Sequence, residues 1–243
     1  KRLRGGSRPG IVQILPPKAV VIPTTGETTF GASADTMIQS QSPTTSFGTF
    51  AGMYLGQTAA GADKNRDLVY FNILPAIIPA TATIASATLT LYHGVTSADA
   101  AGSAAKVFRV LQAWTESATW NKYDGVTNWG TAGCSLDGTD FTSTGAIDWT
   151  VPANATNPHV ITITSLVQDA VTSRAGALHI LLKLVDETTA PNRRNTYRTK
   201  EYATEADKNP LLTVVWSDVA GGASSMMAGD EILAPGADLD RHR

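Results

Sequence analysis

A two-residue period along two stretches of the chain restricts it to an architecture built from paired strands. Within residues 83–92, Thr88 and Thr90 flank Leu89, and residues 106–114 divide in the same way into two alternating sets of side chains. A period of two places successive side chains on opposite faces of a pleated strand. The pattern therefore predicts strands that turn one face toward a core.

Further strand patterns recur along the chain, with turn signals between them. We predict strands at residues 67–73, 83–92, 106–114, 160–164, 177–185 and 211–217. Strands that follow one another without intervening long helices are typical of sandwiches and jelly rolls rather than of parallel α/β folds. The predicted fold is all-β: a jelly-roll-like antiparallel β-sandwich with one short helix and extended N- and C-terminal arms.

One helix and one long loop complete the expected elements. Ser165 and Gln168 match a capping box at the start of an apolar stripe, so we predict a helix over residues 165–174 that closes one end of the sandwich. Residues 121–144 contain two Asp-Gly pairs that favour tight turns. We expect this segment to be a long decorated loop.

The two ends differ in composition from the middle. Residues 1–33 contain four prolines and no acidic residue before Glu27, and prolines favour extended backbone. Residues 218–243 form a Gly/Ala-rich tail with little to bury. We therefore divide the chain into an arm (1–33), a β-sandwich (34–217) and a tail (218–243). The basic residues of the arm are expected to bind neighbouring subunits: Lys1, Arg2, Arg4, Arg8 and Lys18.

Composition disfavours several classes of protein. The formal net charge is −2, whereas a nucleic-acid-binding domain usually carries a basic face. No apolar run approaches the roughly 20 residues that cross a membrane, and the first thirty residues lack the apolar stretch of a signal peptide. Cys134 is the single cysteine, so no internal disulfide is possible, and we expect a small, partly buried side chain there.

A turn bracketed by tryptophans follows the predicted strand at residues 106–114. We interpret its residues as a structural turn lock: Trp114, Glu116, Trp120 and Asn121. In this interpretation Glu116 accepts hydrogen bonds from backbone N–H groups. The alternative is a glycosidase acid, because a carboxyl against an aromatic wall can have a raised pKa. Hydrolysis needs a second carboxylate at a fixed separation, and the sequence places none.

The chain resembles the DNRLRE-domain family from about residue 34 to residue 216. The most specific element is Trp114-Thr115-Glu116 followed by Thr119-Trp120-Asn121. The resemblance also rests on residues 34–38, 47–48, 54–56, 66–75, 82–92, 108–110, 197–201 and 210–214. Members of this family are non-catalytic β-sandwich modules related to certain carbohydrate-binding modules. The resemblance implies binding or scaffolding rather than a reaction.

The titratable residues form no recognisable catalytic or metal-binding pattern. The histidines are scattered without metal-ligand spacing: His93, His159, His179 and His242. His179 alternates with apolar neighbours on a predicted strand, which favours a structural or solvent-facing role over acid–base chemistry. We therefore predict no enzymatic activity, no metal and no cofactor.

Tryptophans and arginines supply the candidate carbohydrate-binding residues. Trp129 lies beside a glycine in the long loop and is expected to be exposed, whereas Trp114, Trp149 and Trp216 fall in strand-like contexts and are expected to be buried. Arg193 and Arg194, near Arg198 and Lys200, could bind a uronate or phosphate through paired hydrogen bonds. A charged strand edge that discourages mispairing is the alternative explanation.

Two functional hypotheses from different classes follow. The first is a virion structural protein, most specifically a capsid-decorating or cement protein of a tailed bacteriophage. It would bind the major capsid protein or copies of itself through its arms, as a homo-oligomer within the assembly. The second is a carbohydrate-binding module for an acidic polysaccharide, secreted or at a cell surface, which would use Trp129, Arg193 and Arg194. An enzyme is the least favoured of the three classes considered.

Overall fold

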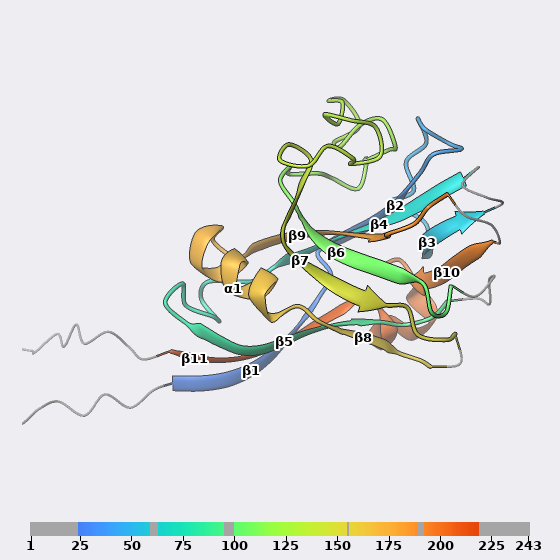
Figure 1. Cartoon of the computed structure of the whole chain (residues 1–243). Coiled ribbons are helices and arrows are strands. Elements are labelled where there is room, and N and C mark those ends of the chain that lie inside the picture. The colour runs from blue at the N-terminus through green and yellow to red at the C-terminus, as the bar shows by residue number, and fades with distance from the viewer. Residues whose placement is uncertain (1–23, 59–62, 95–99, 155, 189–191, 219–243) are drawn as a thin grey trace, which may run out of the picture.

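The computed structural model describes residues 24–58, 63–94, 100–154, 156–188 and 192–218 (Figure 1). The strands are β1 (Thr24–Gly31), β2 (Ala34–Gln39), β3 (Gly52–Thr58), β4 (Asp63–Asn72), β5 (Thr83–Leu91), β6 (Ala104–Val110), β7 (Phe141–Thr150), β8 (His159–Thr162), β9 (Ala177–Leu184), β10 (Arg193–Arg198) and β11 (Leu211–Asp218). The helices are α1 (Thr164–Ser173) and the short 3₁₀ helix η1 (Ala203–Lys208).

The strands form two antiparallel sheets. The smaller sheet has the order β1-β11-β5-β8, and the larger has the order β10-β3-β4-β9-β6-β7, with β2 also paired to β4. Leu89 and Leu212 from the smaller sheet pack with Val69 and Leu182 from the larger one in a single buried cluster. Burial of each such side chain contributes about 2 kcal/mol. The predicted all-β antiparallel sandwich with one short helix is confirmed.

A second buried cluster lies on the outer face of the larger sheet. Residues 111–140, between β6 and β7, fold over this face as a lobe that projects from the sandwich (Figure 1). The side chains in the cluster are Ile38, Leu68, Phe108, Val110, Phe141 and Leu181 with Trp114, Ala118, Trp129 and Cys134 of the lobe. The predicted loop is therefore a packed structure with its own core, and Cys134 is fully buried in it.

Helix α1 closes one end of the sandwich, as predicted. Its buried side chains join the main core. The predicted capping box is wrong, because Ile163 occupies the N-cap position and no side chain caps the helix. The Gln168 side chain instead accepts a hydrogen bond from the Ile84 N–H (2.8 Å) and donates one to the Ala82 carbonyl (3.0 Å), which fixes the helix to β5.

At two boundaries the structure departs from the expected division of the chain. Residues 24–31 of the predicted arm form β1, which pairs with β11 along its whole length, because threonine-rich sequence suits an extended strand. Strand β6 ends at Val110 rather than continuing to Trp114, since the chain turns there into the lobe. The basic residues predicted to bind partners, Lys1, Arg2, Arg4, Arg8 and Lys18, and the tail from residue 219 onward lie outside the described residues.

No helix in the described ranges has the length and apolarity that crossing a bilayer requires.

Candidate functional site

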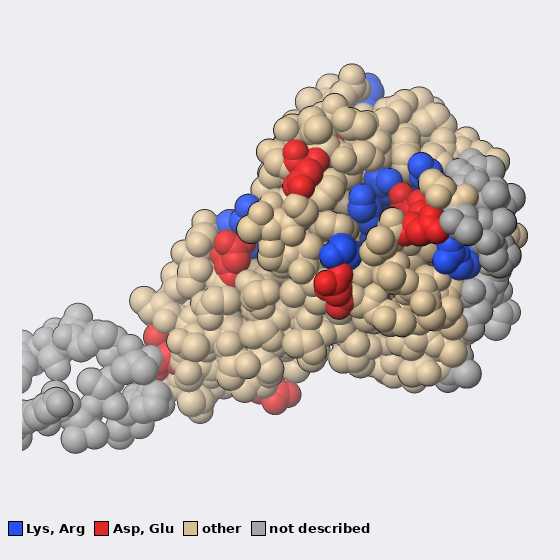
Figure 2. Space-filling view, viewed as in Figure 1, with Lys and Arg blue, Asp and Glu red and all other residues tan. Residues whose placement is uncertain are grey.

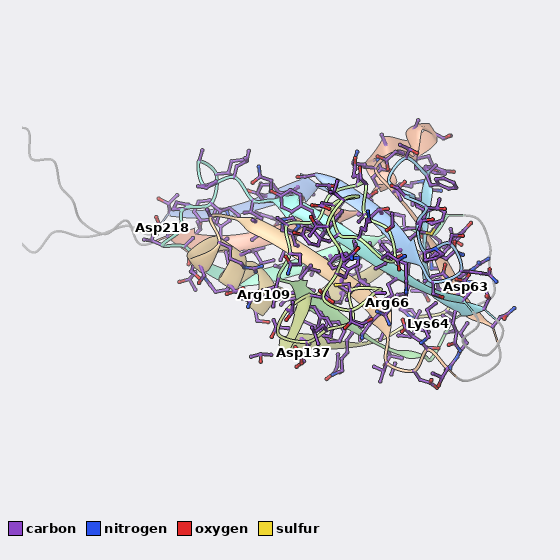
Figure 3. All side chains as sticks on the ribbon, turned by 90° about the horizontal axis from the view of Figure 1, so that it is seen from above. Asp63, Lys64, Arg66, Arg109, Asp137 and Asp218 are labelled. Carbon is purple, nitrogen blue, oxygen red and sulfur yellow. The ribbon has the colours of Figure 1, made fainter. Side chains whose placement is uncertain are left out.

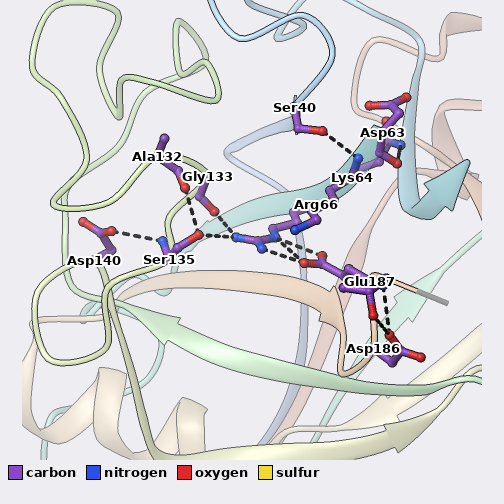
Figure 4. A network of polar contacts seen from close by, with 12 residues as sticks. Ser40, Asp63, Lys64, Arg66, Ala132, Gly133, Ser135, Asp140, Asp186 and Glu187 are labelled. Atoms are coloured by element: carbon purple, nitrogen blue, oxygen red, sulfur yellow. Dashed lines mark hydrogen bonds and ion pairs between the residues drawn. The ribbon is translucent and has the colours of Figure 1, made fainter. Parts of the chain in front are cut away.

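The lobe is fixed to the larger sheet by the guanidinium of Arg66 on β4 (Figure 4). Its Nε and Nη2 donate hydrogen bonds to the Glu187 carboxylate at 2.9 and 2.6 Å, and its Nη1 donates to the Ser135 hydroxyl (2.8 Å) and to the Gly133 carbonyl. The guanidinium also lies 4.9 Å from the ring centroid of Trp120. One buried cation therefore joins the sheet, the loop after β9 and the lobe.

Asp140 organises the part of the lobe that faces this arginine. Its carboxylate accepts hydrogen bonds from the N–H groups of Gly130 (2.6 Å), Thr131 (3.0 Å), Ser135 (3.0 Å) and Leu136 (2.9 Å). The carboxylate is fully buried, so these donors replace its lost hydration. The backbone of residues 130–136 is thereby held in one conformation above the sheet.

A groove of about 250 Å³ lies where the lobe meets β6, β7 and β9. Its lining residues are Lys106, Phe108, Asp137, Phe141, Ser143, Ala146, Lys183 and Val185. Figure 2 shows basic and acidic side chains together on this face, between the lobe and the strands below it. The groove thus combines both signs of charge with an apolar floor.

Two lysines face each other across the strands of the groove. Lys106 of β6 and Lys183 of β9 are direct cross-strand partners, an arrangement that is destabilising for like charges. Lys106 is paired with Asp148 at 2.6 Å. Lys183 forms no ion pair with any described residue, and its ammonium lies 5.3 Å from the Phe108 centroid and 4.9 Å from the Phe141 centroid. Burial, and to a lesser degree the charge of Arg66, lowers the pKa of Lys183.

The floor and the opposite wall of the groove differ in polarity. Phe108 and Phe141 meet edge to face at 4.7 Å, and each is only 5% exposed, so they form an apolar base rather than an open stacking platform. Asp137 accepts hydrogen bonds from the Ser143 hydroxyl and from the Ser143 N–H (2.9 Å), which lower its pKa. The groove therefore offers a cation, a carboxylate and a hydroxyl around an apolar surface.

Trp129 is not the exposed aromatic residue that the sequence predicted. Its side chain is 4% exposed, and its indole Nε1–H donates a hydrogen bond to the Thr119 carbonyl at 2.9 Å. Folding of the lobe onto the sheet buries this ring with Cys134 and other side chains of the second cluster. The edge of Trp129 still borders a hollow of about 280 Å³, which is lined by Asn121, Lys122, Asn128, Trp129 and Ala132.

The residues of the predicted turn lock make other contacts than those expected, and Glu116 has a different partner. The Asn121 N–H donates to the Pro43 carbonyl (3.1 Å), Trp129 N–H donates to the Asn121 carbonyl (3.1 Å), and Trp114 is buried. The Glu116 carboxylate pairs with the Lys200 ammonium at 2.8 Å instead of accepting backbone N–H groups. The lysine, which follows β10, lies close enough to supply the stronger charged contact.

The predicted basic cluster is dispersed into separate contacts. Arg193 pairs with Asp186 (3.3 Å), Arg198 pairs with Glu205 (2.6 Å), and the Arg194 guanidinium lies 4.3 Å from the Tyr54 centroid. A hollow of about 200 Å³ beside them is lined by Phe50, Ala51, Gly52, Tyr54, Gly94, Thr196 and Tyr202. Arg194 therefore lies next to the partly buried ring of Tyr54, but Trp129 borders a different hollow.

His93, His159 and His179 have structural contacts within the molecule, and His242 lies outside the described residues. His179 stacks on Tyr70 at 4.1 Å, and burial lowers its pKa to about 4. Although they are far apart in sequence, His93 and His159 meet at 2.8 Å between their Nε2 atoms, and His159 Nδ1 lies 2.8 Å from the Tyr197 hydroxyl. Sequence spacing did not indicate this pair. In the part of the chain that the structure describes, no group of three or more His, Cys, Asp or Glu side chains is arranged to hold a metal ion.

Comparison with known families gives one match. Residues 26–140 match the model of carbohydrate-binding module family 96. The match supports a carbohydrate-binding-module-like family. It spans slightly less than half of the chain, from β1 to the end of the lobe, and so includes Lys106, Phe108 and Asp137 of the groove. A search of curated proteins found no match to the chain.

The match supports a non-catalytic carbohydrate-binding role, which was the second of the two functional hypotheses. It gives no support to the virion hypothesis or to a phage origin. Neither comparison tests the specific resemblance to the DNRLRE-domain family.

Proposed function

We propose that this protein is a non-catalytic carbohydrate-binding module that holds an acidic polysaccharide in the groove beneath the lobe. The observation that carries the proposal is the position of Lys183: a half-buried ammonium in a groove, opposite a second lysine, with no ion pair to a described residue. A buried charge is costly unless it is paired. A ligand carboxylate supplies the missing partner.

The other groove residues fit the remaining groups of a uronic acid. The carboxylate of Asp137 and the hydroxyl of Ser143 can hydrogen-bond to sugar hydroxyls, while Phe108 and Phe141 contact the apolar C–H face of the ring. Because the two phenyl rings are almost covered, stacking alone would hold a neutral sugar weakly. The groove therefore favours an acidic sugar over a neutral one.

The electrostatics of the groove favour binding over hydrolysis. A glycosidase acid needs a raised pKa so that it carries a proton at neutral pH. Hydrogen bonds from Ser143 lower the pKa of Asp137, so this residue remains an acceptor-only carboxylate. The family match, which is to a binding module, leads to the same conclusion.

Replacing Lys183 with methionine is expected to weaken binding to uronic acid polymers by at least about tenfold, because a charge-assisted contact is lost while the stem of the side chain is retained. Titration calorimetry against a panel of uronic acid polymers, with dextran as the neutral polymer, measures the effect. Lys122→Met is the matched control, since it removes the same charge from the separate hollow in the lobe.

The proposal fails if the wild type binds none of the acidic polymers, or binds dextran equally well. It also fails if the Lys183 and Lys122 variants lose affinity to the same extent. Raising the salt concentration should weaken wild-type binding, because the contact is ionic and partly exposed to solvent.

The hollow beside Arg194 is the second candidate position for the sugar, and the same calorimetric titrations test it. Phe50 is 49% exposed and borders the hollow with Tyr54 and Tyr202, which suits stacking against a sugar ring. If Phe50→Ala or Arg194→Gln, rather than Lys183→Met, abolishes binding, the ligand occupies this hollow instead. The predicted contributions of Trp129 and Arg193 are assessed in the same way with Trp129→Phe and Arg193→Gln.

The virion hypothesis is the less supported of the two, because the family match gives no evidence for it. Its motive was the basic arm, and residues 1–23 lie outside the described residues. A secreted or cell-surface location is proposed instead, because that is where a module of this class meets a polysaccharide. Incorporation into a particle remains testable by deleting residues 1–23 and leaving β1 intact.

A further inference from the structure

Two arginines share one carboxylate oxygen beside helix α1. Arg109 Nη1 and Arg174 Nη2 lie 3.0 and 2.7 Å from Oδ2 of Asp169. Neither arginine has another ion pair with a described residue. The two arginines carry two positive charges and Asp169 carries one negative charge, so the three side chains have a net charge of about +1.

The surroundings do not neutralise this excess charge. The Nε atoms of Arg109 and Arg174 are both buried and have no hydrogen-bond partner among the described residues. His179, whose positive charge would act on Arg174, is neutral at physiological pH, because its pKa is lowered to about 4. Burial lowers the pKa of Arg174; the charge of Asp169 opposes this shift, and the charge of Arg109 adds to it.

A hollow of about 190 Å³ gives access to this charge. Its lining residues are Arg109, Thr144, Gly145, Ser165, Leu166 and Asp169. Arg109 lines the hollow, and Arg174, which contacts the same oxygen of Asp169, is not among the lining residues. The hydroxyls of Thr144 and Ser165 supply further hydrogen-bonding groups at the same place.

The hollow adjoins the lysine groove across a bulge in β7. The register of β6 with β7 jumps from Val107↔Ile147 to Arg109↔Thr142, so residues 143–146 bulge out opposite Phe108. Ser143 and Ala146 line the groove, while the two residues between them line the hollow. Arg109 lies three residues from Lys106, the cross-strand partner of Lys183, so the side chains of Arg109 and Lys183 leave opposite faces of the larger sheet. A sugar chain that contacts both sites must therefore cross the bulge at the edge of the sheet. In Figure 3, Arg109 lies beside the strands of the sandwich, and Asp137 lies nearer the edge of the molecule.

We propose that Arg109, with Thr144 and Ser165, forms a second anion subsite that binds the carboxylate of a sugar further along the chain held by Lys183, beyond the bulge. Arg174 is a positioning residue that keeps Asp169 occupied and does not contact the ligand. This inference rests on the proposed function, since it requires an acidic polysaccharide in the adjacent groove. Bulges in edge strands are frequent beside binding sites because they redirect side chains, and this bulge separates the two subsites.

A length series of oligogalacturonates tests the subsite on the full chain. Wild-type affinity, measured by titration calorimetry, is expected to rise from the monomer to the hexamer as both subsites become occupied. Arg109→Gln is expected to lower hexamer affinity by at least about tenfold and to lower monomer affinity much less, because Lys183 still binds a single uronate. Arg109→Lys retains the charge and should recover part of the loss. Asp169→Asn removes the competing carboxylate and should strengthen hexamer binding.

The outcomes separate this inference from the proposed function. If Lys183→Met abolishes binding but Arg109→Gln matches the wild type at every length, the subsite is refuted and the groove stands. If the wild type binds no oligogalacturonate or other uronic acid polymer, both proposals fail. Thermal unfolding of each variant shows whether it is folded. If Arg109→Gln is unfolded, the affinities of Arg109→Lys and Asp169→Asn are compared with those of the wild type across the oligomer lengths. If both variants match the wild type at every length, the subsite is refuted.

Discussion

Arg66→Met is expected to destabilise the protein by about 3–5 kcal/mol, because it removes the cation from a buried ion pair and leaves the partner charge without compensation. The side chains of Arg66 and Glu187 are 6% and 8% exposed. The substitution also frees the Gly133 carbonyl and the Ser135 hydroxyl of the lobe. Urea unfolding at neutral pH measures the loss as a shift in the midpoint.

Two further variants give this prediction its controls. Arg193→Met breaks the neighbouring pair with Asp186, whose side chains are 25% and 44% exposed, so its cost should stay below about 1 kcal/mol. The double variant Arg66→Met/Glu187→Met removes both buried charges and should recover most of the loss. A small effect of Arg66→Met, or a double variant less stable than the single one, would contradict the account of how the lobe is attached.

Asp67→Asn is expected to stabilise the protein at alkaline pH and to flatten its dependence on pH. Asp67 on β4 is fully buried, and neither of its carboxylate oxygens has a hydrogen-bond partner among the described residues. Burial and the charge of Asp35 raise the pKa of Asp67 well above its ordinary value of 3.8. Burial likewise raises the pKa of Asp35 to about 7, although the N–H of Lys200 donates to its Oδ2 at 2.9 Å.

The direction of this effect follows from proton binding. A carboxyl with a raised pKa in the folded state binds more protons there than in the unfolded chain, so stability falls as pH rises above 3.8 toward the folded-state value. The slope is about 1.4 kcal/mol per pH unit for each such group. His179 opposes this trend, because its pKa is lowered from 6.5 to about 4, but its contribution is complete above pH 6.5.

Unfolding curves at pH 5, 6.5 and 8 test this prediction. The wild type should lose more stability than Asp67→Asn as the pH rises from 5 to 8, because only the wild type must ionise this buried carboxyl. Asn is nearly isosteric and carries no charge, so the comparison isolates the ionisation of Asp67. Parallel pH profiles for the two proteins would show that this carboxyl does not control the alkaline loss of stability.

The strands that sequence reasoning identified are those in which local pattern and tertiary role agree. Residues 83–92 alternate because one face of β5 is in the core, and the structure confirms that strand. Strand β10 was missed because its sequence, RRNTYR, has the polarity of a loop, and its inward residues are Asn195 and Tyr197. Cap and turn-lock contacts were predicted from local motifs, but Gln168 and Glu116 bind partners far away in sequence.

The groove could not be predicted because it depends on strand register. Lys183 is a single charge in an apolar strand, which was the one available signal that it had an unusual role. Its neighbour Lys106 is placed opposite it only by the pairing of β6 with β9. Trp129 was expected to be exposed because glycine-rich loops usually are, but this lobe has its own core.

Mapping of amide chemical shifts during titration with a galacturonate oligomer tests the central claim most directly. The account predicts saturable shifts at Lys106, Ser143 and Lys183, with the resonances around Phe50 and Tyr54 unchanged. Shifts confined to the Phe50 hollow, or no saturable shifts with any uronic acid oligomer, would contradict the claim that this groove binds an acidic polysaccharide.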